Sequence, residues 1–328
     1  MNTYPDIRMR RLRLTETSRK MFGAPLPGPE KFLWPVFVIE GQGREIPIAS
    51  MPGQFRYSID RLERAVEKVA AMGIGGLMIF GVIDDELKNA TGSYSGDENG
   101  LVQRAVRQLR KSFPDLLIFT DVCLCGYTSH GHCAPLAADG GIMNDAALSL
   151  LADAAVSHAR AGAQGVAPSA MMDGQVAAIR KALVENSFHD TLLMSYSTKF
   201  ASSMYGPFRD AADSAPGCGD RKSYQLPYND RRQALRESLQ DEVEGADILM
   251  VKPALFYLDI ISELRERTEL PLAAYNVSGE YSMIQAAAAN GWGDLRAMAR
   301  ESIAAINRSG ADVILSYWSN QYDELFKD

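Results

Sequence analysis

The stretch ADILMVKP, residues 246–253, decides the fold. A helical segment, RRQALRESLQDEV (231–243), precedes it, and Gly245 stands between the two. Glycine is favoured just after a helix because it adopts the left-handed conformation at little cost. The short apolar run that follows is typical of a buried strand, and it ends on the charged residue Lys252. The stretch therefore predicts a unit of helix, glycine and strand that finishes on a polar group.

The same unit recurs along the chain. Gly73, Gly162 and Gly310 also stand just before an apolar run. The predicted strands are FLWPVFVIE (32–40), GGLMIFGV (75–82), LLIFTDV (116–122), AQGVAPS (163–169), TLLMSYS (191–197), ADILMVKP (246–253), LPLAAYNV (270–277) and ADVILSYW (311–318). Predicted helices lie between them, in 60–72, 101–113, 148–161, 176–186, 231–243 and 295–309.

Eight strands alternating with helices predict an α/β fold with a parallel sheet. No linker of changed composition divides the chain, which favours one TIM (β/α)8 barrel over two domains. A doubly wound open sheet is the alternative. In a barrel, functional residues lie at the carboxyl ends of the strands and in the loops after them.

Composition limits the class of protein further. The 328 residues are 46% hydrophobic, enough for a large core, and no apolar run approaches the roughly 18–20 residues that span a membrane. The N-terminus is charged and has no apolar core of a secretory signal, so we expect a soluble cytoplasmic protein. The net charge of −7 argues against a nucleic-acid partner.

Residues 1–30 are expected to form an extended N-terminal arm, and 31–328 the barrel catalytic domain. A basic patch runs from Arg8 to Arg13, and PLPGPE (25–30) follows, a segment that cannot continue a helix. The patch fits a solvated face or an anion site, and equally an arm that grips a neighbouring subunit.

A cysteine cluster follows the third predicted strand. DVCLCGYTSHGHC (121–133) holds Cys123, Cys125 and Cys133 without the paired spacing of structural zinc sites. Three thiolates and no obvious fourth ligand would leave one coordination position open, as in catalytic zinc. The alternative is a buried packing cluster. His130, His132 and Cys218 are further candidate ligands or supporting groups. Asp121 fits either a strand-end cap or a proton carrier.

Two lysines end predicted strands. Lys199 follows the fifth strand and Lys252 closes the sixth. A single lysine here would ordinarily extend its ammonium to solvent. Two of them in an apolar barrel mouth lower each other's pKa toward neutrality, because burial and a like charge both disfavour the ammonium. A neutral amine can attack a carbonyl and form a Schiff base.

The segment 200–228 is long for a loop between a strand and a helix, and such loops often act as lids. It carries Arg209, Arg221 and Lys222, which are suited to binding a carboxylate. A solvated surface loop is the alternative.

These motifs together resemble the δ-aminolevulinic acid dehydratase family, also called porphobilinogen synthases, from about Arg11 to Tyr317. The most specific matches are DVCLCGYTSHGHC, VAPSAMMDG, YSTKFASSMYGPFRDA, GDRKSYQLP, EGADILMVKP and NVSGEY. The resemblance implies a TIM barrel with an arm that wraps a neighbour, usually in an octamer. It implies a lyase that condenses two 5-aminolevulinate molecules to porphobilinogen, with loss of two waters, in haem and other tetrapyrrole biosynthesis.

The resemblance also implies roles for residues. Lys252 would form the Schiff base with the first substrate, and Lys199 would assist or form a second one. Asp121 would lie beside a zinc ion bound by the three cysteines. The remaining implied contacts are Ser278 and Tyr317 to the first substrate's carboxylate, Arg209, Arg221 and Gln225 to the second's, Tyr205 and Phe208 as pocket walls, and Glu237 to an allosteric magnesium.

The chain departs from the family pattern near the predicted mouth. Ala170 and Gln175 stand where the family commonly has an acid and an arginine, and the further departures are Ala254, Phe256 and Asn276. They leave open a paralogue that applies the same chemistry to another amino ketone. A catalytically silent barrel kept for zinc binding or assembly is a third hypothesis, against which the lysine pair argues.

Overall fold

The computed structural model describes residues 3–327, and its centre is a closed barrel of parallel strands. All eight predicted strands are confirmed. They are β1 (Phe32–Val38), β4 (Gly76–Gly81), β5 (Leu117–Val122), β6 (Gly165–Pro168), β7 (Leu192–Lys199), β8 (Ile248–Lys252), β9 (Leu272–Asn276) and β10 (Val313–Ser316). Each strand pairs with the next in parallel register, and β10 closes on β1 through Phe32 opposite Ile314. The open-sheet alternative is therefore wrong.

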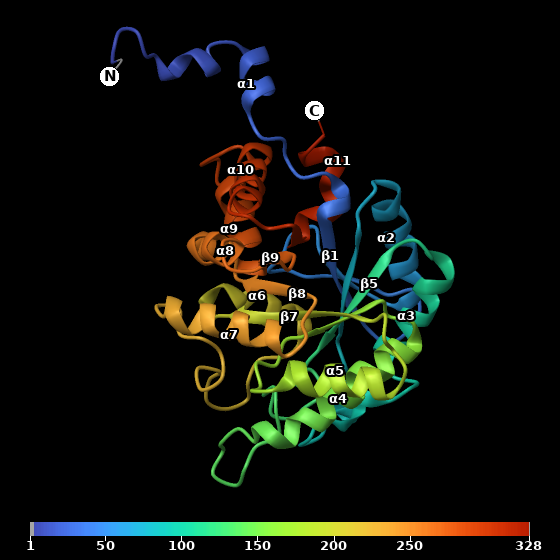
Figure 1. Ribbon diagram of the computed structural model, residues 1–328. Coiled ribbons are helices and arrows are strands. Elements are labelled where there is room, and N and C mark those ends of the chain that lie inside the picture. The colour runs from blue at the N-terminus through green and yellow to red at the C-terminus, as the bar shows by residue number, and fades with distance from the viewer. Residues whose placement is uncertain (1–2, 328) are drawn as a thin grey trace.

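Helices surround the barrel (Figure 1). The six predicted helices correspond to α2 (Ile59–Ala71), α3 (Leu101–Ser112), α4 (Asn144–Ala161), α5 (Gln175–Glu185), α7 (Arg231–Val243) and α10 (Leu295–Arg308). Each of them buries an apolar stripe against the strands, as Leu62, Val66 and Val69 do in α2. Burial of such a stripe is what stabilises a helix in a protein of this kind.

Several elements were not predicted. The structure adds α6 (Gly206–Ala212), α8 (Leu258–Arg265), α9 (Ser278–Ala289) and α11 (Tyr322–Leu325), and a short hairpin of β2 (Glu45–Pro47) and β3 (Phe55–Tyr57). Short 3-10 turns lie at Ser203–Tyr205 (η5) and Leu255–Tyr257 (η6). The helix α6 lies inside the long segment that was predicted to be a lid, and α9 begins at the expected substrate contact Ser278.

The N-terminal arm extends away from the barrel (Figure 1). It contains a 3-10 turn, η1 (Met9–Arg13), and a short helix, α1 (Glu16–Phe22), so its backbone is only partly extended. Neither element buries a residue. At its base, the Tyr322 hydroxyl of α11 donates to the Pro27 carbonyl at 2.9 Å. No helix among the described residues is long and apolar enough to cross a membrane.

Candidate active site

The two predicted lysines are neighbours across the sheet. Lys199 ends β7 and Lys252 ends β8, and the parallel register places them opposite one another. Both side chains are almost wholly buried. The Lys199 Nζ donates to the Ser169 carbonyl oxygen at 2.5 Å, just beyond β6. Three adjacent strand ends therefore bring two amines into one site.

Aromatic rings surround the Lys252 amine. Its Nζ lies 4.3 Å from the ring centre of Tyr275, 5.0 Å from that of Tyr196, 4.9 Å from that of Phe208 and 5.2 Å from that of Tyr205. Burial, and then the neighbouring Lys199, lower the pKa of Lys252 well below its usual value. The aromatic rings stabilise the ammonium form of Lys252 only modestly. Burial, which favours the neutral amine, is therefore the larger effect.

Tyr196 and Tyr275 were missed by the sequence analysis. Each sits within an apolar strand, in MSYS and AAYN, and is fully buried. A tyrosine in a strand interior that ends at a functional residue is the signal that could have found them. The Tyr275 hydroxyl lies 3.1 Å from that of Tyr317, whereas the Tyr196 hydroxyl has no hydrogen-bond partner among residues 3–327.

The three cysteines converge as expected. The sulfur atoms of Cys123, Cys125 and Cys133 all lie within 4.8 Å of one another, and those of Cys123 and Cys125 are 3.4 Å apart. Hydrogen bonds from the other two thiols lower the pKa of Cys133 well below its usual value, while they and burial raise that of Cys123. Thiolates are ligands that zinc prefers, so these residues fit a metal with an open position.

The other candidate ligands lie apart from the thiol group. The His132 ring contacts the Cys218 carbonyl at 2.8 Å and the Tyr224 hydroxyl at 3.2 Å, and His130 contacts the Ala90 carbonyl at 3.1 Å. Cys218 is exposed. Within residues 3–327, none of these side chains joins the three-cysteine group. The histidines are therefore placed to support the loop.

Asp121 has both the thiols and the lysines as neighbours. It lines one small cavity together with Cys123, Cys125, Lys199 and Lys252. Burial, and then the neighbouring Cys125, raise the pKa of Asp121 to about 6, against the opposing effect of the lysines. A carboxyl group that titrates near neutrality can take up and release a proton.

Two arginines of the segment 200–228 have a buried Nε without a hydrogen-bond partner among residues 3–327. Arg221 donates to the carbonyls of Gly131 at 2.9 Å and Ser214 at 2.6 Å, but its buried Nε has no partner among residues 3–327. The same is true of the Nε of Arg209. Burial and then Arg221 lower the pKa of Arg209. Two like charges with free N–H groups favour an anion between them.

The remaining predicted contacts lie where the lid meets the barrel. The Ser278 hydroxyl accepts from the Phe208 backbone N–H at 2.9 Å, and the Tyr205 hydroxyl donates to the Lys252 carbonyl at 3.1 Å. A side chain at Gly279 would meet the Met204 carbonyl at 2.5 Å, so glycine permits this close approach. The buried Gln225 amide has no partner among the described residues, as expected of a group that awaits a ligand.

The lid is closed over the site. The cavity bounded by the lysines, the thiols, Phe208 and Arg221 has a volume of about 40 Å³. A water molecule needs roughly 10–15 Å³ of such space, so the cavity holds a few waters and no larger molecule. In this conformation, the segment 200–228, which supplies Phe208 and Arg221 to the cavity wall, leaves no room for a larger molecule.

Comparison with known proteins identifies the family. The family model described as delta-aminolevulinic acid dehydratase matches residues 6–325. The delta-aminolevulinic acid dehydratase of Archaeoglobus fulgidus is 49% identical over 99% of both chains, and that of Escherichia coli is 50% identical over 95% of both. The chain belongs to the delta-aminolevulinic acid dehydratase family. It is therefore a lyase of tetrapyrrole biosynthesis.

A solved structure of the family supports the fold. It is the Toxoplasma gondii delta-aminolevulinic acid dehydratase (porphobilinogen synthase), which is described as a complex with the reaction product porphobilinogen. It is 41% identical, with a TM-score of 0.95 over 97% of this chain and 91% of its own. The expected fold class and enzyme class are thus confirmed.

Of the five residues that depart from the common family pattern, four are buried and one is exposed. Ala170, Ala254 and Asn276 are fully buried at strand ends, and the Gln175 side chain accepts from the Met172 backbone N–H at 3.3 Å. Phe256 is exposed. None of these five side chains lines the small cavity that holds the lysines and thiols.

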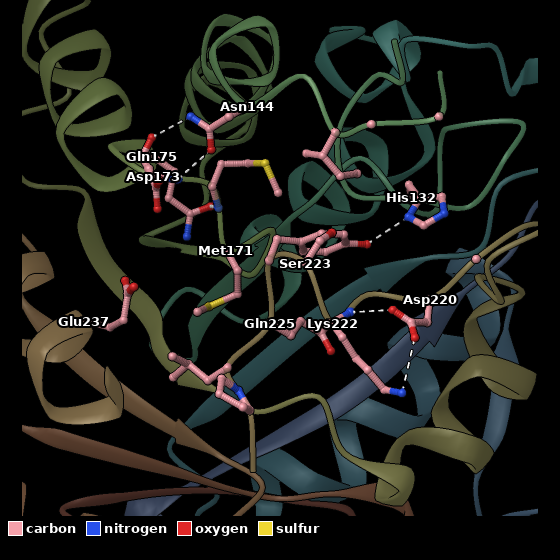
Figure 2. A pocket seen from close by; sticks show the side chains of 18 of the residues that line it. His132, Asn144, Met171, Asp173, Gln175, Asp220, Lys222, Ser223, Gln225 and Glu237 are labelled. Carbon is pink, nitrogen blue, oxygen red and sulfur yellow. Dashed lines mark hydrogen bonds and ion pairs between the residues drawn. The ribbon is translucent and has the colours of Figure 1, made fainter. Parts of the chain in front are cut away.

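Glu237 lines a second, larger pocket of about 770 Å³, together with residues of the segment 218–227 (Figure 2). Asp173, Asp241 and Gln225 line it too. Burial, and then Asp173, raise the pKa of Glu237. Glu237 belongs to no group of three convergent metal ligands within residues 3–327. Among the described residues, the predicted magnesium contact Glu237 therefore has no preassembled group of three ligands around it.

Proposed function

We propose that the chain condenses two molecules of 5-aminolevulinate to porphobilinogen and releases two waters. The observation that carries the proposal is the pair of buried amines, Lys199 and Lys252, facing one cavity beside three convergent thiols. The Toxoplasma gondii relative bound to porphobilinogen supports the same chemistry.

Lys252 would form the Schiff base with the first substrate. Its pKa is lowered mainly by burial, so a neutral amine is available to attack the ketone carbon. The carbonyl oxygen leaves as water once two protons are supplied. Lys199, which lies opposite in the register, would deliver a proton or form a second imine with the other substrate.

Zinc is the metal that we propose for Cys123, Cys125 and Cys133. When bound, zinc with an open position supplies Lewis-acid polarisation of a substrate oxygen. Asp121 borders the same cavity, and its pKa of about 6 suits it to accept a proton from substrate carbon or nitrogen near neutral pH.

The lid would bind the substrates' carboxylates and exclude water. Arg209 and Arg221 offer unpaired N–H groups, and the Gln225 amide is also unpaired among residues 3–327. These three would hold the second substrate. Ser278 and Tyr317 would hold the first, at the ends of β9 and β10. Exclusion of water by the closed lid favours imine formation over imine hydrolysis.

The exposed apolar side chains of the N-terminal arm support a proposal about assembly. Seven large apolar side chains of the arm are exposed, namely Tyr4, Ile7, Met9, Leu12, Leu14, Met21 and Phe22. Such a surface suits contact with a second copy, and we propose a homo-octamer with the arm, residues 1–30, outside the barrel of residues 31–328. Sedimentation of the chain with and without residues 3–23 tests this, and unchanged mass would contradict it.

Glu237 is proposed to contact a regulatory magnesium, supported by the carboxylates of Asp173 and Asp241 in the same pocket. Magnesium titration of the activity of the wild type and of Glu237→Gln tests this role.

We also propose a cytoplasmic location. The four free cysteines support a reducing compartment of this kind.

The deciding experiment supplies 5-aminolevulinate and measures a pyrrole product. Borohydride reduction should trap the substrate on Lys252, found by peptide mapping, and Lys252→Met should abolish both adduct and product.

Chelation should abolish activity with little loss of fold, because the barrel core does not include the metal. Poor turnover of 5-aminolevulinate by the wild type would favour a paralogue with another amino ketone. Full activity of a Cys123→Ala, Cys125→Ala, Cys133→Ala variant would exclude the metal.

A further inference from the structure

A buried carboxyl group that the proposed reaction does not use joins two neighbouring strand ends. Glu280 lies in the first turn of α9 and has no exposed surface. Its Oε1 accepts from the backbone N–H groups of Ala254 at 3.1 Å and Leu255 at 2.7 Å. Its Oε2 accepts from Val277 N at 2.9 Å and Asn276 Nδ2 at 3.1 Å.

Helix capping explains only part of this arrangement. The bond to Val277 N satisfies a free donor at the start of α9, as a glutamate at the third helical position often does. The two bonds of Oε1 reach a different element, the start of the 3-10 turn η6 (Leu255–Tyr257). They hold the loop that follows Lys252 directly, 25 and 26 residues earlier in the chain.

The network continues to a third strand. The Asn276 Oδ1 accepts from the Ser316 hydroxyl at 2.9 Å, and both side chains are fully buried. Ser316 is the last residue of β10 and is followed directly by Tyr317. One connected set of bonds therefore ties the ends of β8, β9 and β10. These ends carry Lys252, Ser278 and Tyr317.

The carboxyl group suits this position because all four of its contacts are donors. A carboxylate can accept from all four, whereas a glutamine would turn its NH₂ group toward two of them. Buried donors left unpaired are costly, so the loops would shift to find other partners. Displacements of about 1 Å at a site of this kind can slow a reaction about a hundredfold.

We propose that Glu280 is a positioning residue that sets the Lys252 amine against the groups that hold the first substrate's carboxylate. The inference rests on the proposed Schiff-base role of Lys252. Glu280 touches no reacting atom; it acts through the loop at Ala254 and Leu255 and through Asn276.

The test compares three variants with the wild type, all as full chains loaded with zinc. Glu280→Gln keeps the size of the side chain and disturbs the β8 link. Ser316→Ala removes the β10 link, together with the hydrogen bond that the Ser316 hydroxyl accepts from the Trp318 backbone N–H, and leaves all four bonds to Glu280 in place. Glu185→Gln makes the same chemical change at an exposed position of α5 and serves as the control. Each protein is measured for kcat, KM for 5-aminolevulinate, thermal unfolding, and the rate of borohydride-trapped adduct at Lys252 at saturating substrate.

We expect Glu280→Gln to slow adduct formation and kcat at least tenfold. Ser316→Ala should raise KM at least threefold and leave the rate of adduct formation within twofold, because it affects only the end of β10. The control should match the wild type. This split between kcat and KM would not arise from a merely structural role, which lowers the active fraction of both variants and leaves KM unchanged.

Equal adduct rates in the wild type and Glu280→Gln, with an adduct on Lys252 in both, would overturn this inference alone. A wild type that forms no adduct on Lys252 would overturn the proposed function and this inference with it. If Glu280→Gln yields no folded protein, Asn276→Ala replaces it. That variant removes one bond to Oε2 and the link to Ser316, so a threefold rise in KM supports the proposal and unchanged kinetics overturn it.

Discussion

The proposed chemistry depends on two amines that share a buried site. A lysine at the end of an apolar strand was predictable from the sequence, because Lys199 and Lys252 each follow an apolar run. The rings of Tyr196 and Tyr275 were not, because strand periodicity does not show which buried side chains meet inside a closed barrel. Their contacts depend on the register between strands, which the sequence alone leaves open.

Removal of the Lys199 charge should make the Lys252 amine harder to deprotonate. The Lys199 ammonium is the second-largest cause, after burial, of the lowered pKa of Lys252. In Lys199→Met that pKa rises, so the pH at which substrate becomes trapped on Lys252 should shift upward. The rate of borohydride adduct formation against pH measures the shift. Lys181→Met, at an exposed position, should not change the profile, and an unshifted profile in Lys199→Met would contradict the coupling.

A substitution at Ala170 tests the same electrostatic argument by adding a negative charge near the lysines. It is fully buried and follows Ser169, whose carbonyl accepts from Lys199. A carboxylate placed there favours the ammonium form of nearby lysines and so raises their pKa. We expect Ala170→Asp to shift the pH optimum of porphobilinogen formation upward, and Ala170→Asn, which adds an uncharged group of similar size, to leave the optimum in place. The same optimum in both variants would refute the electrostatic argument.

At the scale of elements, three segments outside 200–228 contact α6, the helix within the predicted lid. The Ser50 hydroxyl donates to Asp210 at 2.6 Å, and the Arg56 guanidinium donates to the Ala211 carbonyl at 2.7 Å. Lys88 forms an ion pair with Asp213 at 3.0 Å, just beyond the end of α6. All three contacts act on the C-terminal part of α6, so they fix the helix that carries Phe208 and Arg209.

Asp213 offers a substitution that removes only the charge from this contact. Its φ of 46° lies in the left-handed region, which asparagine also tolerates. Asp213→Asn should loosen the lid, raise KM severalfold and speed tryptic cleavage at Arg221 and Lys222. Lys181→Met breaks a comparable exposed pair, Lys181 with Glu185, far from the lid. A lid that resists trypsin equally in Asp213→Asn and in the wild type would show that the ion pair does not hold it.

The elements that the sequence did not reveal share a physical cause. The strands β2 and β3 have three residues each, too few for a periodic pattern, and α6 has seven. The helix α9 (SGEYSMIQAAAA) buries Tyr281 and Ile284 in its first half, but its second half is a run of alanines, so no large apolar residue marks the helical period there. Long amphipathic helices such as α3 were predictable to within a residue, because their polar and apolar faces differ strongly.

At the scale of the whole molecule, buried titratable groups act on stability in opposite directions as the pH falls. Burial raises the pKa of Asp241 to about 7, and this carboxyl group stabilises the fold as it takes up a proton. His158 does the opposite. It lies in α4 with its ring nitrogens unpartnered among residues 3–327, and burial lowers its pKa to about 4. Because the effects oppose one another, the wild-type pH profile alone cannot assign them.

A variant without the His158 imidazole separates the contribution of this histidine to stability from that of the buried carboxyl groups. The unfolded chain protonates this histidine near pH 6.5 and the folded chain only near pH 4, so the unfolded state binds more protons between these values. Stability from the neutral imidazole is therefore present above pH 6.5 and falls by up to about 3 kcal/mol as the pH approaches 4. We expect His158→Phe to gain stability relative to the wild type over that range, measured as urea midpoints at pH 7, 5.5 and 4. The carboxyl groups and the cysteine site are common to both proteins and cancel in the difference. His189→Phe, at an exposed position, should show a constant difference from the wild type, and a constant difference for His158→Phe as well would mean that the buried ring does not govern acid sensitivity.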